Sequence, residues 1–181
     1  MKNIGVFFYQ GAGHLFINAL KFLRYKTTEI HSSTVFEDLD GIILPGGESS
    51  VQYQYCVRNN IDEKIRNFHL KNKPILGTCA GAILLSRYRS RLVNGLGLID
   101  IDMERNHYGR QISSGMQVDD HGNKICMIRA PGIISYEKSV YILNTLKDQP
   151  IFVRQGNVYC TTFHPELSPL NNLNPIKHIF G

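Results

Sequence analysis

The sequence predicts an α/β fold with helices on both faces of a mainly parallel central sheet, a three-layer α/β/α sandwich. Two observations support this architecture. Short, unbroken apolar segments alternate with longer stretches whose apolar residues recur at helical spacing. Glycine-rich turns also follow two of the apolar segments, and parallel sheets bind their ligands at such strand ends.

The first half of the chain carries this alternation most clearly. Its expected strands are continuous apolar runs, typical of strands buried on both faces. These runs are residues 4–9, 41–44 and 74–77. The helices between them show helical periodicity or begin at a residue that can cap. They are expected at residues 14–25, after Ser49 or Ser50, at residues 61–71 and at residues 80–86.

The second half is richer in strand-like segments. Strands are expected near residues 98–101, 112–118, 125–128, 151–154 and 158–163. Gly156 followed by Asn157 predicts a hairpin turn between the last two strands. Asn174 and Pro175 offer a cap and a first-turn proline for a short final helix.

Length and composition indicate one domain over residues 1–181. The chain is 43% apolar and 19% charged, which argues against disorder, and it has no internal repeat or linker. It contains no run of 18 apolar residues, so we expect no membrane span. The apolar stretch at the N-terminus is too short for a signal peptide and is better interpreted as a buried strand. We therefore expect a cytoplasmic protein.

Charge and cysteine content narrow the function classes. The net charge of +5 suggests an anionic partner, but the basic residues are scattered, and their densest cluster is residues 87–91. Without a zinc finger or a basic-aromatic pattern, we expect no nucleic-acid partner. The four cysteines lack C-x-x-C spacing, so free thiols are expected, three of them buried and structural.

Cys79 is the exception, because it stands in a glycine frame, Gly77-Thr78-Cys79-Ala80-Gly81. This pattern has the form of a nucleophile elbow, a sharp turn from strand to helix with cysteine in place of serine. The amino end of the following helix favours the reactive thiolate. A small buried cysteine in a tight turn is the alternative interpretation of the same pattern.

A histidine and a carboxylate complete a candidate triad far downstream. His164 and Glu166 follow an apolar strand, and in an extended chain these two residues face the same side. Glu166 could then accept a hydrogen bond from the imidazole and fix its tautomer. The alternative is a loop histidine beside a surface carboxylate. The P-C-x-x-C segment of zinc deaminases is absent, so we expect no metal.

Other motifs suggest how a substrate could be held. The turn Pro45-Gly46-Gly47-Glu48-Ser49-Ser50 could present backbone N–H groups to an oxyanion. Arg105, Arg110 and Arg129 each carry a planar fork suited to a carboxylate. The pair Gly11 and Gly13 is too weak a signal for a dinucleotide site, so we expect no cofactor.

Together these segments resemble the class I (triad) glutamine amidotransferases, which have a flavodoxin-like fold. Within that class the chain resembles the glutaminase subunits of pyridoxal 5′-phosphate synthase. The resemblance rests on blocks in family order over nearly the entire chain: Gln10-Gly11-Ala12, Leu44-Pro45-Gly46-Gly47-Glu48-Ser49-Ser50, Gly77-Thr78-Cys79-Ala80-Gly81, Glu104-Arg105-Asn106, Gly109-Arg110-Gln111, Ile128-Arg129-Ala130-Pro131 and Phe163-His164-Pro165-Glu166-Leu167.

The resemblance implies specific roles. Cys79 would be the nucleophile, His164 the general base and acid, and Glu166 the orienting carboxylate. The oxyanion would be stabilised by the N–H groups of Gly47 and Ala80. The glutamine pocket would comprise Gly47, Glu48, Ser49, Arg105, Ile128 and Arg129. The partners implied are L-glutamine and a synthase subunit, which receives the ammonia for vitamin B6 biosynthesis in a large hetero-oligomer.

Three segments depart from the usual family pattern, namely residues 13–16, residues 112–115 and Gly132. We expect these differences to affect the partner interface more than the chemistry. Two other functions fit the same fold. One is a different cysteine hydrolase, such as an intracellular peptidase, although the blocks around Arg105 and Arg129 argue against it. The other is a binding subunit that has lost turnover.

Overall fold

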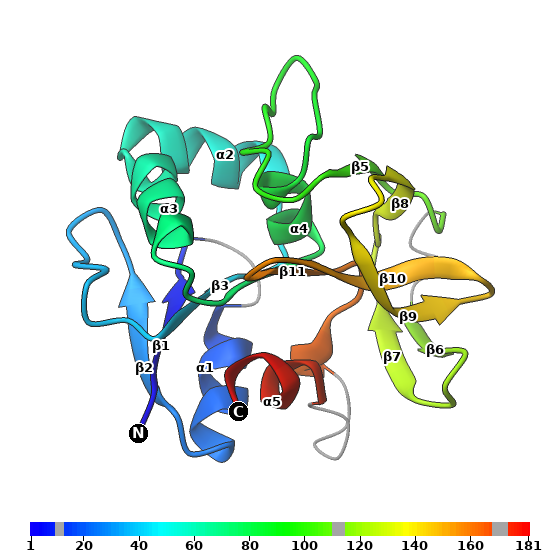
Figure 1. The fold of residues 1–181 in the computed structure, drawn as a ribbon, viewed down its shortest axis with the longest axis horizontal. Coiled ribbons are helices and arrows are strands. Elements are labelled where there is room, and N and C mark those ends of the chain that lie inside the picture. The colour runs from blue at the N-terminus through cyan, green and yellow to red at the C-terminus, as the bar shows by residue number, and fades with distance from the viewer. Residues whose placement is uncertain (10–12, 110–114, 168–173) are drawn as a thin grey trace.

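The structure, a computed structural model, describes residues 1–9, 13–109, 115–167 and 174–181. Its centre is a seven-stranded sheet (Figure 1). The strands of this sheet are β1 (Asn3–Phe7), β2 (Lys26–Ile30), β3 (Gly41–Leu44), β4 (Ile75–Thr78), β9 (Tyr141–Leu146), β10 (Gln149–Gln155) and β11 (Val158–Thr161). Their spatial order is β2-β1-β3-β4-β11-β10-β9. The first five are parallel to one another, and β10 runs antiparallel to both of its neighbours.

Helices cover both faces of the sheet, as predicted (Figure 1). They are α1 (Gly13–Phe22), α2 (Ser49–Arg58), α3 (Ile61–Leu70), α4 (Ala80–Leu85) and α5 (Asn174–Phe180), with a short 3₁₀ helix η2 (Pro165–Leu167). Helices α2, α3 and α4 pack on one face, and α1 and α5 on the other. Two small antiparallel sheets flank this sandwich. They pair β5 (Ile101–Glu104) with β8 (Gly132–Tyr136), and β6 (Gly115–Val118) with β7 (Lys124–Met127).

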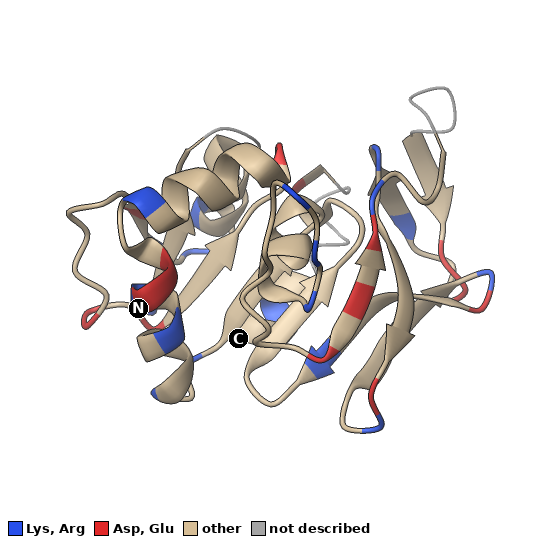
Figure 2. Cartoon of the chain, turned by 90° about the horizontal axis from the view of Figure 1, so that it is seen from above, with Lys and Arg blue, Asp and Glu red and all other residues tan. Residues whose placement is uncertain are grey.

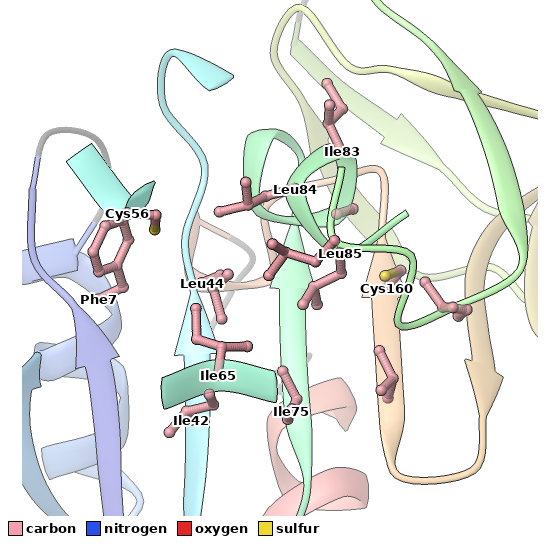
Figure 3. Packing of buried hydrophobic residues seen from close by; sticks show 14 of the residues in the cluster. Phe7, Ile42, Leu44, Cys56, Ile65, Ile75, Ile83, Leu84, Leu85 and Cys160 are labelled. Carbon is pink, nitrogen blue, oxygen red and sulfur yellow. The ribbon is translucent and has the colours of Figure 1, made fainter. Parts of the chain in front are cut away.

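The strands of the central sheet alternate between the two cores. On β3, Ile42 and Leu44 face α2, α3 and α4, whereas Ile43 faces α1 and α5. Figure 3 shows Ile42 and Leu44 beside residues of α3 and α4 such as Ile65 and Leu84. The continuous apolar runs of the sequence are therefore strands that are buried on both faces.

Several predicted elements differ from the structure. The helix expected over residues 14–25 ends at Phe22, because Arg24 has a left-handed backbone (φ 63°) and turns the chain into β2. The strand expected at residues 98–101 begins only at Ile101. The N–H of Leu98 instead donates to the Leu85 carbonyl at the end of α4. Strands β2, β8 and β9 were not predicted. The Gly156–Asn157 hairpin turn is confirmed, since Gln155 pairs with Val158.

Candidate active site

The site lies where three neighbouring parallel strands end. Strand β3 leads into Pro45 and Gly46, β4 leads into Cys79, and β11 leads toward His164. These three strands are adjacent in the sheet, in the order β3-β4-β11. The carboxyl ends of parallel strands share one edge, so segments far apart in the sequence meet there.

Cys79 occupies a strained turn directly before α4. Its backbone angles, φ 49° and ψ −106°, lie in a region that residues other than glycine rarely adopt. Its N–H donates to the Thr161 carbonyl at 2.9 Å, which anchors the turn to the end of β11. The side chain is largely buried. Such an over-determined, strained position is typical of functional sites and has the geometry of a nucleophile elbow.

The flanking glycines are required by close packing. A Cβ at Gly81 would overlap the Leu44 carbonyl oxygen of β3, which is backbone and cannot move aside. A Cβ at Gly77 would lie 2.7 Å from the Gly81 carbonyl oxygen. The absence of both side chains lets α4 begin tightly against β3 and β4, and this contact fixes the position of Cys79.

His164 and Glu166 form a buried pair. The Nδ1 atom of His164 lies 2.8 Å from Oε1 of Glu166, and the two residues are only 7% and 9% exposed. The predicted pairing is present, but Glu166 reaches the ring through the turn of η2 and not along an extended strand. The alternative of a surface carboxylate is wrong. The His164 N–H donates to the Cys126 carbonyl at 2.9 Å, which fixes the backbone beneath the ring.

The imidazole interacts with both the thiol and the carboxylate. Burial alone would lower the pKa of His164, but hydrogen bonds with Cys79 and Glu166 and their charges outweigh it. Together they raise the pKa to about 10. The ring therefore sits between a candidate nucleophile and an orienting acid, the arrangement that a base and acid catalyst needs.

The first glycine of the turn after β3 touches this imidazole. A Cβ at Gly46 would overlap Cε1 of His164, so only glycine allows the ring and the turn to lie this close. The next residue, Gly47, has φ 150° and lies on the wall of the cavity that opens above Cys79. The contact of Gly46 with His164 was not predicted, because the two residues are more than a hundred positions apart in the sequence.

The cavity has a volume of about 380 Å³, a size that suits a small polar substrate. All the predicted pocket residues line it, together with two of the three candidate triad residues, Cys79 and His164. Glu166 lies behind the ring. Six further lining residues were not predicted as part of the pocket, namely His14, Leu15, Gly46, Ile83, Asn106 and Leu167. Arg110 lies outside the described residues.

Opposite charges meet at the mouth of this cavity. Nη2 of Arg105 lies 2.8 Å from Oε1 of Glu48, the N-cap residue of α2. Burial alone would raise the pKa of Glu48, but hydrogen bonds from Ser50 and the charge of Arg105 outweigh it and lower the pKa. Ile128, which is 39% exposed, gives the wall an apolar face beside Arg129. The cavity therefore offers both signs of charge near an apolar surface.

Gly132, one of the departures from the family pattern, packs closely against the side chain of His107. Gly132 begins β8 opposite Glu104 of β5. A Cβ at Gly132 would overlap the ring of His107, whose Nδ1 lies 2.6 Å from Oε2 of Glu104. The missing side chain at residue 132 thus accommodates the histidine at residue 107, in the small sheet next to Arg105.

Charged residues outside the cavity also form ion pairs. Figure 2 shows basic and acidic residues interspersed over the chain. In the basic cluster, Arg87 pairs with Asp102 at 2.9 Å and with Glu137 at 3.2 Å. Among the described residues, no group of three or more His, Cys, Asp or Glu could hold a metal ion. No helix in this part of the chain is long and apolar enough to cross a bilayer.

Comparisons with known proteins identify relatives of this chain. The model of the SNO glutamine amidotransferase family matches residues 6–174. Pyridoxal 5′-phosphate synthase subunit PdxT of Caldicellulosiruptor saccharolyticus is 37% identical over 177 residues, 94% of each chain. The PdxT subunit of Thermosipho africanus is 41% identical over 142 residues, 73% of each chain. A crystal structure of a glutamine amidotransferase matches with a TM-score of 0.88 at 31% identity, over 98% of each chain.

Proposed function

This chain belongs to the SNO glutamine amidotransferase family, and from that premise we propose that it hydrolyses L-glutamine to L-glutamate and ammonia. We propose further that it acts as the glutaminase subunit of a pyridoxal 5′-phosphate synthase, because its relatives are named as PdxT subunits of that synthase. The observation that carries the chemistry is the His164 imidazole, which interacts with both Cys79 and Glu166 at the floor of the cavity.

The first half of the reaction forms a thioester. Because its raised pKa keeps His164 protonated near neutral pH, the thiol proton of Cys79 already resides on the imidazole, and the sulfur attacks the side-chain carbonyl carbon of glutamine as a thiolate. The carbonyl oxygen becomes an oxyanion, which the N–H groups of Gly47 and Ala80 stabilise. The imidazolium then gives its proton to the departing nitrogen, the C–N bond breaks, and ammonia leaves.

The second half releases glutamate. His164 removes a proton from water, and the resulting hydroxide attacks the thioester carbon. The C–S bond breaks, glutamate departs, and the sulfur leaves as a thiolate beside the imidazolium, which restores the starting state. Throughout, Glu166 accepts a hydrogen bond from Nδ1, so Nε2 is the ring atom that exchanges protons with the substrate nitrogen and with water.

The charges of the cavity suit the backbone groups of a free amino acid. We assign the α-carboxylate of glutamine to the arginines, Arg105 and Arg129, whose planar forks match a carboxylate. Glu48 would attract the α-ammonium group, and Ile128 would contact the methylene groups of the side chain. Both ends of the substrate then carry a charge that the pocket recognises. This arrangement favours free glutamine over a residue within a peptide, and so argues against a peptidase.

The ammonia would pass to a synthase subunit that binds this chain. That subunit consumes it in making pyridoxal 5′-phosphate, and the two kinds of chain would form a large hetero-oligomer. The support for this partner is the extent of the similarity, because the PdxT match covers 94% of both chains.

The test is a glutaminase assay with and without the cognate synthase subunit. We expect wild-type protein to release glutamate, and Cys79→Ala to lower kcat by at least about a thousandfold. Cys56→Ala is the matched control, since Cys56 is a fully buried thiol in the core under α2 and should leave turnover intact. Burial raises the pKa of Cys56 to about 12, so this thiol stays protonated and unreactive near neutral pH.

Other outcomes separate the rival functions. Activity that persists in Cys79→Ala contradicts the mechanism. Cleavage of peptides without glutamate release from free glutamine indicates a peptidase. Labelling of Cys79 by a glutamine-like electrophile, with no glutamate produced even beside the synthase subunit, indicates a binding subunit without turnover.

A further inference from the structure

We infer that Gln52 is a positioning residue for the oxyanion site, because its buried amide fixes the direction in which the Gly47 N–H points. The inference rests on the proposed glutaminase function. Gln52 lies on the inner face of α2, seven positions after Pro45, and its side chain is completely buried.

Within the described residues, the side-chain hydrogen bonds of Gln52 go to the turn that follows β3. Its Nε2 atom donates to the carbonyl oxygens of Pro45 and Gly46, each at 3.2 Å. Both bonds are buried. Helix α2 thus holds two successive carbonyl groups of the glycine turn toward the protein interior.

The planarity of the peptide means that a fixed carbonyl also fixes the direction of the neighbouring N–H group. The Gly46 carbonyl and the Gly47 N–H belong to one planar trans peptide, so they point in opposite directions. A carbonyl held toward Gln52 aims the N–H away from the interior. Gly47 itself lies on the wall of the cavity, and within the described part of the chain its N–H has no hydrogen-bond partner.

The same turn contacts the catalytic base. Gly46 packs against Cε1 of His164 so closely that no side chain fits between them. Rotation of the Gly46–Gly47 peptide plane would therefore redirect the Gly47 N–H group. It would also disturb the contact between Gly46 and the imidazole. Gln52 is the side chain in a position to prevent that rotation.

The amide is also an unusual choice for a core position. Its Oε1 atom is buried and has no hydrogen-bond partner within the described residues. An unsatisfied buried acceptor is unfavourable, and a methionine of similar shape would avoid it. The feature that glutamine provides and methionine lacks is the donor group directed at the turn.

The experiment compares Gln52→Met with Gln54→Met in the complex with the synthase subunit. Gln54 is exposed on the same helix, so its variant controls for the substitution itself. We expect Gln52→Met to lower kcat by about tenfold to a hundredfold, less than the complete loss of an oxyanion donor. The KM for glutamine should change by less than about twofold, because the pocket charges are untouched.

A second measurement separates positioning from a general disturbance of the site. Iodoacetamide alkylates Cys79 by displacing iodide from carbon, a reaction that forms no oxyanion. We expect its rate at Cys79 to be the same in wild type and Gln52→Met. A merely structural role for Gln52 would lower the alkylation rate and kcat together.

The outcomes that overturn the inference are distinct from failure of the proposed function. The inference is wrong if the wild-type complex is active and Gln52→Met retains its kcat, or if alkylation slows in parallel. Gln52→Leu is the second donorless variant, and if neither variant folds, Gln52 is a structural residue. A wild-type complex that releases no glutamate contradicts the proposed function, and the inference with it.

Discussion

The His164 ring is enclosed on three sides by groups that act on it differently. Burial favours the neutral imidazole, whereas Cys79 and Glu166 favour the protonated one, and the partners prevail. On the third side the Gly46 backbone touches Cε1. The folded site therefore raises the proton affinity of the imidazole, and the stability of the protein depends in turn on whether this ring is protonated.

This linkage predicts how stability depends on pH. The pKa of His164 is about 10 in the folded protein against 6.5 for an ordinary histidine, so its protonation stabilises the fold. The contribution is complete below about pH 6.5 and is lost as pH rises to about 10. The free energy of unfolding of wild type should therefore fall, relative to His164→Asn, by at least about 1.4 kcal/mol across this range.

Urea unfolding of both proteins near pH 6, pH 8 and pH 9.5 measures the difference directly. The other histidines titrate in both proteins and cancel in the comparison. A difference between the two proteins that does not change with pH would show that the ring carries no stabilising proton.

Most residues of the candidate site could be predicted from the sequence, but the residue that we infer holds the glycine turn in place could not. Cys79 and His164 stand in short motifs whose local spacing has a chemical meaning. Gln52 has no such signal. The buried positions of α2 include Ser49, Gln52 and Cys56, so a mostly polar set of residues faces inward and the helix lacks an apolar stripe. Its inward direction follows only from the packing of α2 above the turn.

Among the secondary-structure elements, the prediction succeeded for strands buried on both faces and missed three strands that carry exposed residues, β2, β8 and β9. Strand β2 has the sequence Lys-Thr-Thr-Glu-Ile and lies at one edge of the sheet, largely accessible to solvent. Strand β9 lies at the other edge, and three residues of β8 are exposed. Because such strands are held by pairing and not by burial of an apolar run, their sequences carry little signal.

The pairing of β5 with β8 depends on the match between Gly132 and His107. We expect Gly132→Ala to destabilise the protein by about 1–3 kcal/mol, since the new Cβ would overlap the His107 ring. Urea unfolding should show that His107→Ala removes most of this penalty. The coupling between the two sites in a double-mutant cycle would then be about 0.5–3 kcal/mol. Additive effects of the two substitutions would contradict the proposed contact.

At the scale of the molecule, the central sheet lies between two apolar cores, and its strands pack into both of them. Each of its buried strands contributes side chains to both sides, as Ile42 and Ile43 do on β3. Loss of packing on one face would therefore disturb the register on which the other face depends. We accordingly propose that residues 1–181 fold as one cooperative unit.

Two neighbouring substitutions test this cooperativity. Ile42→Ala and Ile43→Ala each remove a fully buried side chain, one from each core, and each should cost about 2–5 kcal/mol. Far-ultraviolet circular dichroism and tyrosine fluorescence should report the same midpoint for each variant. Two separated transitions in either variant would indicate that the cores unfold independently.

The contact between Gly46 and His164 has one more consequence. The Cε1–H group of the imidazole gives a well-separated proton resonance, and here that group lies directly against the backbone of the glycine turn. Any shift of the turn changes the local surroundings of this single proton. The resonance therefore serves as a built-in spectroscopic reporter, through which the arrival of glutamine or of a synthase subunit at the turn can be followed without an added label.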